Sequence, residues 1–398
     1  MRIVAIAAQT VRWPIAGRGA ARGRSERAAV IVEVRGARGE VGLGEAAPLP
    51  GMSRETLEDA ERAIAGFARQ APFDVVDRDA AFAIAGAAVS AASVRVAIAG
   101  AAVTAPTARV AIAGAAVTAP STRVAIAGAA GSAPSARFAI ETALLDALAR
   151  ARGVSLACLL RGPAMEPRVG ATVPLAAVVD DPEAARAAVA AGIRWLKIKL
   201  TASDDVGRVF AIAAAAPAAR LRIDANRTWP RAEVVARLAA LAGLPIDYVE
   251  EPCRAAHQLL DAALPCKLAL DESLGELAPD ELAAALRGPA LAALVVKPTL
   301  LGGFAVSLAL AERARQAGVA AIASHGLEGP VGTAACAELA LALGGGHPAG
   351  LASHAALTAW RSSPPQLAAD HLHAAPGHGL GFEDLDLETL VGSLHAGP

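Results

Sequence analysis

The first 50 residues alternate apolar and polar positions with a period of two, which is the pattern of half-buried β-strands. Residues 1–13 (MRIVAIAAQTVRW) and 27–36 (RAAVIVEVRG) predict two strands, and residues 41–48 (VGLGEAAP) predict a shorter third strand. The pattern then changes to a helical one. Ser53 is the expected N-cap, so a helix is predicted over residues 53–69.

Residues 81–136 consist of four copies of a 14-residue unit such as RVAIAGAAVTAPTA. The copies contain glycine, later also proline, and almost no large apolar side chains, so they cannot build much of a core. We expect an insertion in the first domain, without a function, that forms short helical turns or a mobile excursion. The following segment, 137–153, predicts an amphipathic helix with its large apolar side chains mostly on one face.

From about residue 169 onward, short apolar runs alternate with alanine-rich helical segments, which is the pattern of a parallel β/α barrel. A chain of 398 residues is also too long for one compact core. The sequence therefore predicts an α/β protein with an N-terminal α+β domain over 1–165 and a barrel over 166–363. A tail, 364–398, is expected to pack back on the first domain.

Composition narrows the possible partners and the location. The formal net charge is -1, so nothing favours a nucleic acid or an anionic membrane surface as partner. No stretch of large apolar residues is long enough for a membrane span, and the N-terminus lacks the features of a signal peptide. The four cysteines show no CxxC spacing, which is typical of reduced cysteines in a cytoplasmic protein. Oligomeric state is left open.

Five apolar runs each end in a charged side chain. These side chains are Lys199, Asp224, Glu250, Asp271 and Lys297, at intervals of 25, 26, 21 and 26 residues. Each interval is about the length of a strand, a helix and two loops. Because parallel strands of a barrel all end at the same face, we expect the five side chains to meet there.

Three of these groups, Asp224, Glu250 and Asp271, are carboxylates that would repel one another without a cation between them. Their hard oxygen donors, with no well-placed His or Cys, favour Mg²⁺, with Mn²⁺ possible, over zinc. Any one of them alone could instead cap the following helix. Three at consecutive strand ends favour a metal site.

The lysines add acid–base chemistry. Lys197 and Lys199 are two residues apart, so they share one face of a strand, and each is expected to lower the pKa of the other. A neutral amine can act as a general base. Lys297 lies across the barrel and could act as a second acid or base, or as a fixed cation. The set indicates proton transfer beside a stabilised anion, with a small-molecule carboxylate as substrate.

This array (K-x-K, D-A-N, V-E-E-P, D-E-S and K-P) resembles the enolase superfamily, in its muconate-lactonising branch. The stretches GLGEAAPLPGMSRET, LRIDANRTW and VVKPTLLGG are similar to the o-succinylbenzoate synthase family. The resemblance covers nearly the whole chain except 81–136. It implies an enolase-like fold, with an α+β capping domain and a (β/α)7β barrel of the TIM type, and a Mg²⁺ site. It also implies a reaction, the syn dehydration of 2-succinyl-6-hydroxy-2,4-cyclohexadiene-1-carboxylate to o-succinylbenzoate in menaquinone biosynthesis.

The resemblance also assigns roles to residues. Asp224, Glu250 and Asp271 match the metal ligands, Lys199 the base that then helps hydroxide to leave, and Lys297 the lysine that stabilises the enediolate. Substrate-binding or supporting roles fall to Lys197, Arg222, Asn226, Ser324, His325 and Gly326. His325 departs from the small-residue turn of the family, and we expect a loop histidine hydrogen-bonded to backbone. The loops around Arg18–Arg27 and Gly51–Met52 match lids over the substrate.

Other activities remain open. An N-succinylamino acid racemase, or an enzyme with both activities, would use the same scaffold with a lysine on each face of the substrate. A dipeptide epimerase is disfavoured because residues 347–357 (HPAGLASHAAL) lack the Asp-x-Asp pair of that group. A non-catalytic relative, with the repeats as an interaction module, is disfavoured by the intact set of acid–base groups.

Overall fold

The computed structural model describes residues 1–15, 25–98, 133–161, 172–200, 206–344, 346–383 and 385–394. Three of the arginines expected in a lid, Arg18, Arg22 and Arg24, lie outside the described residues, as do repeat residues 99–132. The predicted domain boundary at residue 165 also lies outside them.

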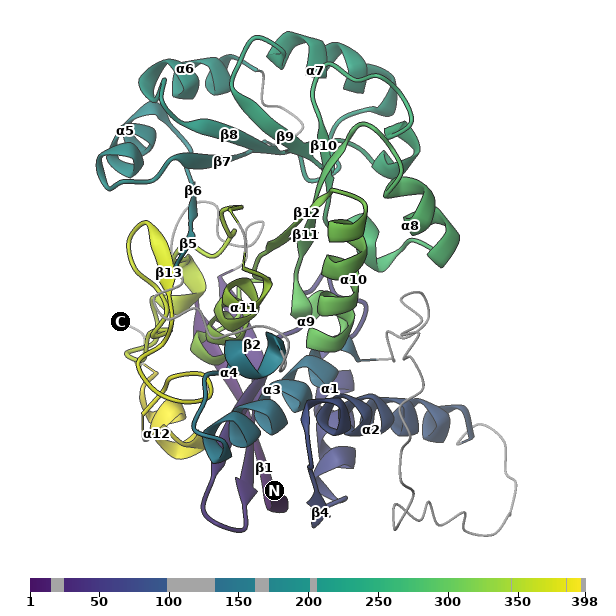
Figure 1. The fold of residues 1–398 in the computed structure, drawn as a ribbon, viewed down its shortest axis with the longest axis vertical. Coiled ribbons are helices and arrows are strands. Elements are labelled where there is room, and N and C mark those ends of the chain that lie inside the picture. The colour runs from purple at the N-terminus through teal and green to yellow at the C-terminus, as the bar shows by residue number, and fades with distance from the viewer. Residues whose placement is uncertain are drawn as a thin grey trace.

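The N-terminal part contains a four-stranded antiparallel sheet with the order β3-β2-β1-β4. Its strands are β1 (Arg2–Pro14), β2 (Glu26–Gly36), β3 (Val41–Ala46) and β4 (Phe73–Asp74). Helices α1 (Leu57–Ala68) and α3 (Pro134–Ala151) pack against this sheet (Figure 1). Most of β2 is buried, whereas β1 alternates only at its ends and exposes much of its middle. The three strands predicted from the sequence are present, but burial with a period of two appears only at the ends of β1.

Helix α1 begins later than predicted, and Ser53 is not its cap. Thr56 caps the helix: its side chain accepts the backbone N–H of Asp59, and the Asp59 carboxylate accepts the backbone N–H of Thr56. This reciprocal capping box satisfies two otherwise unpaired N–H groups, which explains the start at Leu57. Ser53 instead accepts the backbone N–H of Leu49 at 2.7 Å in the preceding turn.

Helix α2 (Arg78–Ile98) contains the first copy of the repeat and buries Ala81, Ala85 and Ala88 at helical spacing. The helix predicted over 137–153 is confirmed as α3, but its amphipathic character is not: every residue from 134 to 149 is buried, rather than one face. This helix is surrounded by β3, α2, α4 (Leu156–Arg161) and α9 (Pro298–Leu301). Its polar side chains have buried partners: Glu141 accepts the backbone N–H of Phe304 at 2.6 Å.

The second part is a parallel sheet of seven strands in the order β12-β11-β10-β9-β8-β7-β6. The strands are β6 (Ala176–Val178), β7 (Trp195–Lys199), β8 (Arg220–Asp224), β9 (Ile246–Glu250), β10 (Leu268–Leu270), β11 (Leu291–Val296) and β12 (Ala320–Ala323). The helices between and after them are α5 (Pro182–Ala190), α6 (Gly207–Ala215), α7 (Val234–Leu241), α8 (Pro279–Ala285), α9, α10 (Phe304–Gln316) and α11 (Pro330–Leu343). Sequential order in space is what the β/α alternation predicts.

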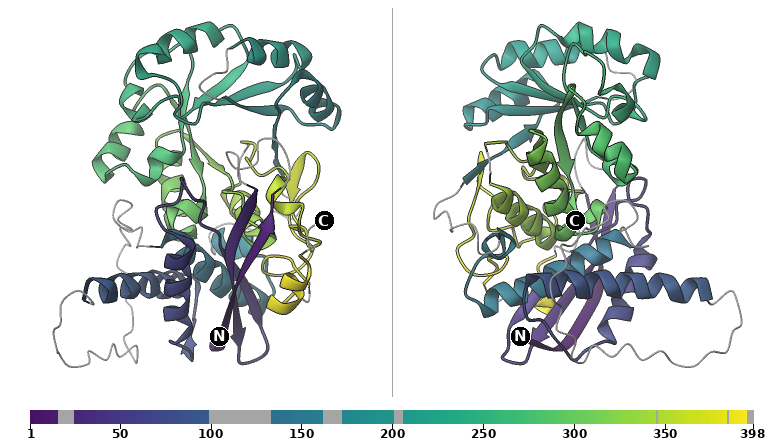
Figure 2. Two further views of the ribbon diagram at one scale, coloured as in Figure 1. Left: turned by 180° about the vertical axis from the view of Figure 1, so that it is seen from behind. Right: turned by 45° about the vertical axis from the view of Figure 1, so that its right-hand side comes forward.

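The sheet curls, and its two edges are linked through a short segment that follows α11. Ala349 forms a parallel bridge to Leu175, and Gly350 forms one to Ser324 (Figure 2 shows the curl from two sides). The α/β prediction, with a separate antiparallel sheet beside a curled parallel sheet, is confirmed. No described helix has the length and apolar character that crossing a lipid bilayer requires.

The C-terminal segment contacts both parts. Strand β13 (His371–His373) pairs with β5 (Thr172–Pro174), and α12 (Leu387–Gly392) packs on β1 and β2. The backbone N–H of Leu387 donates to Glu33 of β2 at 2.9 Å. The boundaries at 363 and 364 stay predictions.

The contact between β3 and α3 requires glycine. A Cβ atom on Gly44 would overlap the carbonyl oxygen of Ala139 in α3. We therefore expect Gly44→Ala to lower the free energy of unfolding by at least about 2 kcal/mol, because backbone must shift to admit the methyl group. Gly66→Ala in α1 is the matched control: a Cβ there meets only the tip of Arg69, so a gain of about 0.5–1 kcal/mol is expected. Urea titrations measure both, and equal effects would contradict this account.

Candidate active site

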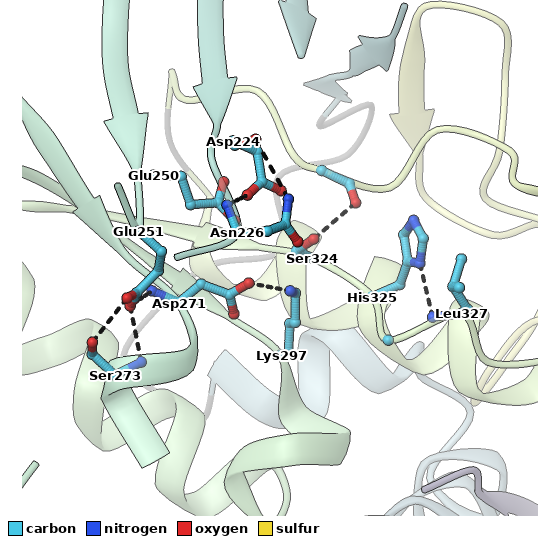
Figure 3. A network of polar contacts seen from close by, with 12 residues as sticks. Asp224, Asn226, Glu250, Glu251, Asp271, Ser273, Lys297, Ser324, His325 and Leu327 are labelled. Carbon is cyan, nitrogen blue, oxygen red and sulfur yellow. Dashed lines mark hydrogen bonds and ion pairs between the residues drawn. The ribbon is translucent and has the colours of Figure 1, made fainter. Parts of the chain in front are cut away.

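The strand ends bring the five charged groups of the sequence array to one face of the parallel sheet. Lys199 is the last residue of β7, Asp224 of β8 and Glu250 of β9, while Asp271 and Lys297 directly follow β10 and β11. Strand register places Lys199 beside Asp224, and Asp224 beside Glu250. Figure 3 shows the three carboxylates and Lys297 pointing toward a shared space.

Lys197 forms the central ion pair of the site. Its Nζ lies 2.8 Å from Asp224 Oδ2 and 2.7 Å from Glu250 Oε2. Burial alone would lower the pKa of Lys197, but the two carboxylates outweigh it and hold the pKa well above its usual range. The expectation of a lowered pKa was therefore wrong for this lysine, because the sequence did not reveal its direct ion pairs.

Lys199 has a different environment although it lies on the same face of β7. Burial lowers its pKa, and the positive charge of Lys197 lowers it further, as expected. Among the described residues, no carboxylate forms an ion pair with Lys199. Its amine is therefore the one at the strand ends that is most readily available as a base.

Lys297 is buried and donates a hydrogen bond to Asp271 at the end of the neighbouring strand. Burial opposes its charge, but the Asp271 carboxylate outweighs this effect and raises the pKa of Lys297. The chain contains only four lysines, and three of them lie in this site.

The donor set fits a hard divalent cation. Asp224, Glu250 and Asp271 are 5%, 1% and 6% exposed, so their charges have little water to stabilise them. Burial, with the negative charge of Asp224, raises the pKa of Glu250 to about 7. Among the described residues, no three His, Cys, Asp or Glu side chains lie close enough together to hold a metal ion. Asp224, Glu250 and Asp271 each contact a lysine ammonium instead. The positive charge of the Lys197 ammonium balances two of these carboxylates, as a metal cation between them would.

Residues beside the candidate metal ligands hold the site in shape, including some that the sequence did not single out. The Glu251 carboxylate accepts the backbone N–H groups of Asp271 and Ser273, both at 2.9 Å, and pairs with Arg227 at 3.0 Å. Its side chain therefore supports the loop that carries Asp271, a role consistent with its position next to Glu250. No feature of the sequence pointed to a role for Arg227 or Ser273.

Asn226 and Arg222 flank Asp224 on either side. The Asn226 backbone N–H donates to Asp224 Oδ1 at 3.1 Å. Asn226 and Arg227, shortly after β8, and Glu251, directly after β9, have positive φ angles, a costly conformation for residues with side chains. Arg222 is 2% exposed and donates to the carbonyl of Pro348 at 2.8 Å, so it braces the barrel interior.

The loop after β12 carries the remaining candidates. Ser324 Oγ donates to the carbonyl of Gly350 at 3.1 Å, and the Gly326 N–H donates to Glu328 at 2.7 Å. His325 Nδ1 accepts the backbone N–H of Leu327 at 3.1 Å, so it is the backbone-bonded loop histidine that was expected. Burial lowers the pKa of His325 well below its usual range, and nearby cationic groups add to the effect.

A cavity of about 260 Å³ opens beside Asp271 and Lys297. Its lining includes Asn226, Asp271 and Lys297 from the strand ends, and Gly51 and Met52 from the N-terminal part. The second expected lid loop therefore borders the cavity. Arg27, by contrast, was expected in a lid and is instead 2% exposed and bonded to backbone carbonyls.

The fold and the strand-end groups define the class of this protein, and comparison with known families agrees. The family described as enolase C-terminal domain-like matches residues 180–386, so the chain belongs to this family and to the enolase superfamily.

The chain is also similar to individual curated proteins. The chain is 36% identical over 183 residues to the o-succinylbenzoate synthase of Mycobacterium tuberculosis, covering 44% of this chain and 53% of the relative. It is 34% identical over 139 residues to that of Yersinia enterocolitica, covering 32% and 39%. The chain thus spans about half the length, or less, of the curated relatives it matches.

Solved structures show the same fold over nearly the whole chain. A dipeptide epimerase from Methylococcus capsulatus superposes with a TM-score of 0.73 at 24% identity, covering 96% of this chain and 99% of that one. A muconate lactonizing enzyme superposes with a TM-score of 0.70 at 22% identity, covering 99% of both chains. At such identities the similarity establishes the enolase-like fold alone.

Glu251 provides a test of how the site is held together. We expect Glu251→Gln to weaken Mg²⁺ binding about tenfold, because the backbone of Asp271 loses its anionic acceptor. Isothermal titration of the protein with Mg²⁺ measures the affinity, and thermal unfolding without metal reports any loss of stability. Glu276→Gln is the matched control, since Glu276 pairs with the same Arg227 but is exposed and does not contact Asp271. Unchanged affinity in Glu251→Gln would refute the supporting role.

Proposed function

We propose that this protein is an o-succinylbenzoate synthase, a hydro-lyase that converts 2-succinyl-6-hydroxy-2,4-cyclohexadiene-1-carboxylate to o-succinylbenzoate. The observation that carries the proposal is the array Lys199, Asp224, Glu250, Asp271 and Lys297 at consecutive strand ends. The similarity to curated o-succinylbenzoate synthases supports the choice of substrate. We further propose a role in menaquinone biosynthesis and a cytoplasmic location, which fits four free cysteines.

Asp224, Glu250 and Asp271 would hold a Mg²⁺ ion, with Mn²⁺ as an alternative. When bound, the ion supplies positive charge that stabilises the anion formed from the substrate carboxylate. Removing a proton from carbon next to a carboxylate is otherwise difficult, because negative charge builds up on a group that is already anionic. Charge stabilisation of this kind is worth several kcal/mol in a water-poor site.

The reaction itself needs one base. Lys199 Nζ takes the proton from the carbon next to the carboxylate, which breaks the C–H bond. The resulting ammonium of Lys199 then returns a proton to the departing hydroxide on the same face. The C–O bond breaks, water leaves, and the ring becomes aromatic. Lys297 remains protonated and provides a fixed positive charge beside the intermediate.

N-succinylamino acid racemisation is the second candidate, either alone or beside dehydration. It requires a lysine on each face of the substrate, and Lys199 and Lys297 occupy different strands of the site. Lys199 forms no ion pair with a described carboxylate, whereas Lys297 is bonded to Asp271. This asymmetry favours the one-base elimination. Dipeptide epimerisation is less favoured because residues 347–357 lack the Asp-x-Asp pair expected there.

Purified protein should be assayed with Mg²⁺ on the cyclohexadiene carboxylate and, side by side, on N-succinyl amino acids. We expect dehydration with the larger kcat/KM. Racemisation with the larger kcat/KM would assign the second candidate, and inactivity on both would refute the proposal.

Substitution of the base tests the mechanism. We expect Lys199→Ala to reduce dehydration at least about a hundredfold while Mg²⁺ still binds, because the base is lost and the carboxylates remain. Steady-state kinetics and Mg²⁺ titration measure the two effects. The fourth lysine, Lys267, is exposed and donates to the carbonyl of Pro289, so Lys267→Ala should leave both unchanged. Turnover near the original rate in Lys199→Ala would exclude this lysine as the base.

A further inference from the structure

A buried arginine of the N-terminal sheet reaches the loop that carries His325. The Arg27 guanidinium donates to the carbonyls of Ala47 and Pro48, both at 2.8 Å, on its own side. It also donates to the carbonyl of Gly326 at 3.2 Å and, through Nε, to that of Leu327 at 2.9 Å. One planar side chain thus joins the segment after β3 to the loop after β12.

Leu327 is held in a conformation that its side chain disfavours. Its φ angle is +63°, which costs a residue with a Cβ atom roughly 1–2 kcal/mol. The Arg27 hydrogen bond to its carbonyl helps to offset this cost. In this conformation the Leu327 N–H points at His325 and donates to Nδ1 at 3.1 Å.

This hydrogen bond determines which nitrogen of the neutral His325 ring carries the proton. Because Nδ1 accepts a hydrogen bond, a neutral ring carries its proton on Nε2. The ring also stacks on His354, with centroids 4.0 Å apart and planes 18° apart, and His354 Nε2 lies 3.2 Å from Thr333 Oγ1. Figure 3 shows the His325 ring beside Ser324, on the side of the site opposite Glu251.

We infer that Arg27 is a positioning residue that acts through Leu327 to present the Nε2–H of His325 to the substrate. The inference rests on the proposed function in one respect, the substrate-binding role that the resemblance implies for Ser324, His325 and Gly326. The group recognised would be a hydrogen-bond acceptor, such as a carboxylate or carbonyl oxygen, at the end of the substrate away from the metal. Arg27 itself does not touch the metal ligands or either catalytic lysine in any described hydrogen bond.

A second buried contact at the same junction provides a comparison. Glu45 of β3 accepts the backbone N–H groups of Gly329 and Gly332 at the start of α11. It joins the same two parts of the protein but does not bond to Leu327 or His325. Loss of the Glu45 carboxylate should therefore weaken the contact between the two parts without changing the hydrogen bond to His325 Nδ1.

The test substitutes Arg27→Lys, since one ammonium cannot reach carbonyls on both sides of the junction. We expect KM to rise about tenfold, equivalent to about 1.4 kcal/mol, with kcat changed less than about threefold. Nitrogen NMR of the imidazole rings should show loss of the hydrogen bond to His325 Nδ1. The chain has eight histidines, and the spectrum of His325→Gln assigns the signal.

Three controls separate positioning from stability. Glu45→Gln should lower the melting temperature without changing KM or the His325 signal. Arg12→Lys, at an exposed ion pair with Glu26 on the same sheet, should change neither. In a Leu327→Gly background the effect of Arg27→Lys on KM should be smaller, because glycine adopts this conformation without strain. If Arg27→Lys does not fold, Arg27→Gln replaces it with the same expectations.

An unchanged KM in folded Arg27→Lys would overturn the inference, and so would a raised KM with an unaltered His325 signal. Fully additive effects of the Arg27 and Leu327 substitutions would also overturn it. If the protein turns over neither substrate class, the proposed function fails. The His325 signal, which needs no substrate, then decides by itself whether Arg27 positions the ring.

Discussion

The site depends on one electrostatic constraint, the crowding of three carboxylates at adjacent strand ends in a water-poor space. Asp224 and Glu250 are neighbours in register, so their charges cannot be separated without dismantling β8 and β9. Such an arrangement is stable only with compensating positive charge. Lys197 and Lys297 provide it in this structure. A divalent ion at the proposed metal site would balance the same negative charges, so the positions of the two lysines and the proposed metal site are electrostatically linked.

The same constraint explains why lysine appears here in a chain that otherwise relies on arginine. Of 37 basic residues only four are lysines, and three lie at this site. Arginine remains charged in proteins, whereas a buried lysine can lose its proton. The two lysines of β7 show how position decides this: Lys197 contacts two carboxylates and stays charged, while Lys199, beside it, has a lowered pKa. A single strand thus carries both a structural cation and a candidate base.

The sequence was sufficient to predict features that depend on the spacing of residues along the chain. It did not predict contacts between segments that are distant in the sequence. Strand ends recur at the interval of a β/α unit, so their spacing along the chain is enough to predict that the five charged groups share one face. The start of α1 was misplaced because Ser53 and Thr56 are both plausible caps, and Asp59 decides between them. The periodicity of the sequence predicted that only one face of α3 is buried. Its polar side chains are buried too, because they bond to other segments, and periodicity does not reveal such partners. Arg27 looked like a loop residue for the same reason.

These contacts change how the N-terminal part is understood. It does more than cover the barrel, because Arg27 and Glu45 bond directly to the backbone after β12. The segment matched by the family, 180–386, carries all five charged groups of the strand ends. Arg27, whose side chain donates to the carbonyls of Gly326 and Leu327, lies outside this segment. The charged strand ends and the loop after β12 are therefore held by different parts of the chain: the parallel sheet carries the charged groups, while a contact from the N-terminal sheet holds the backbone of the loop.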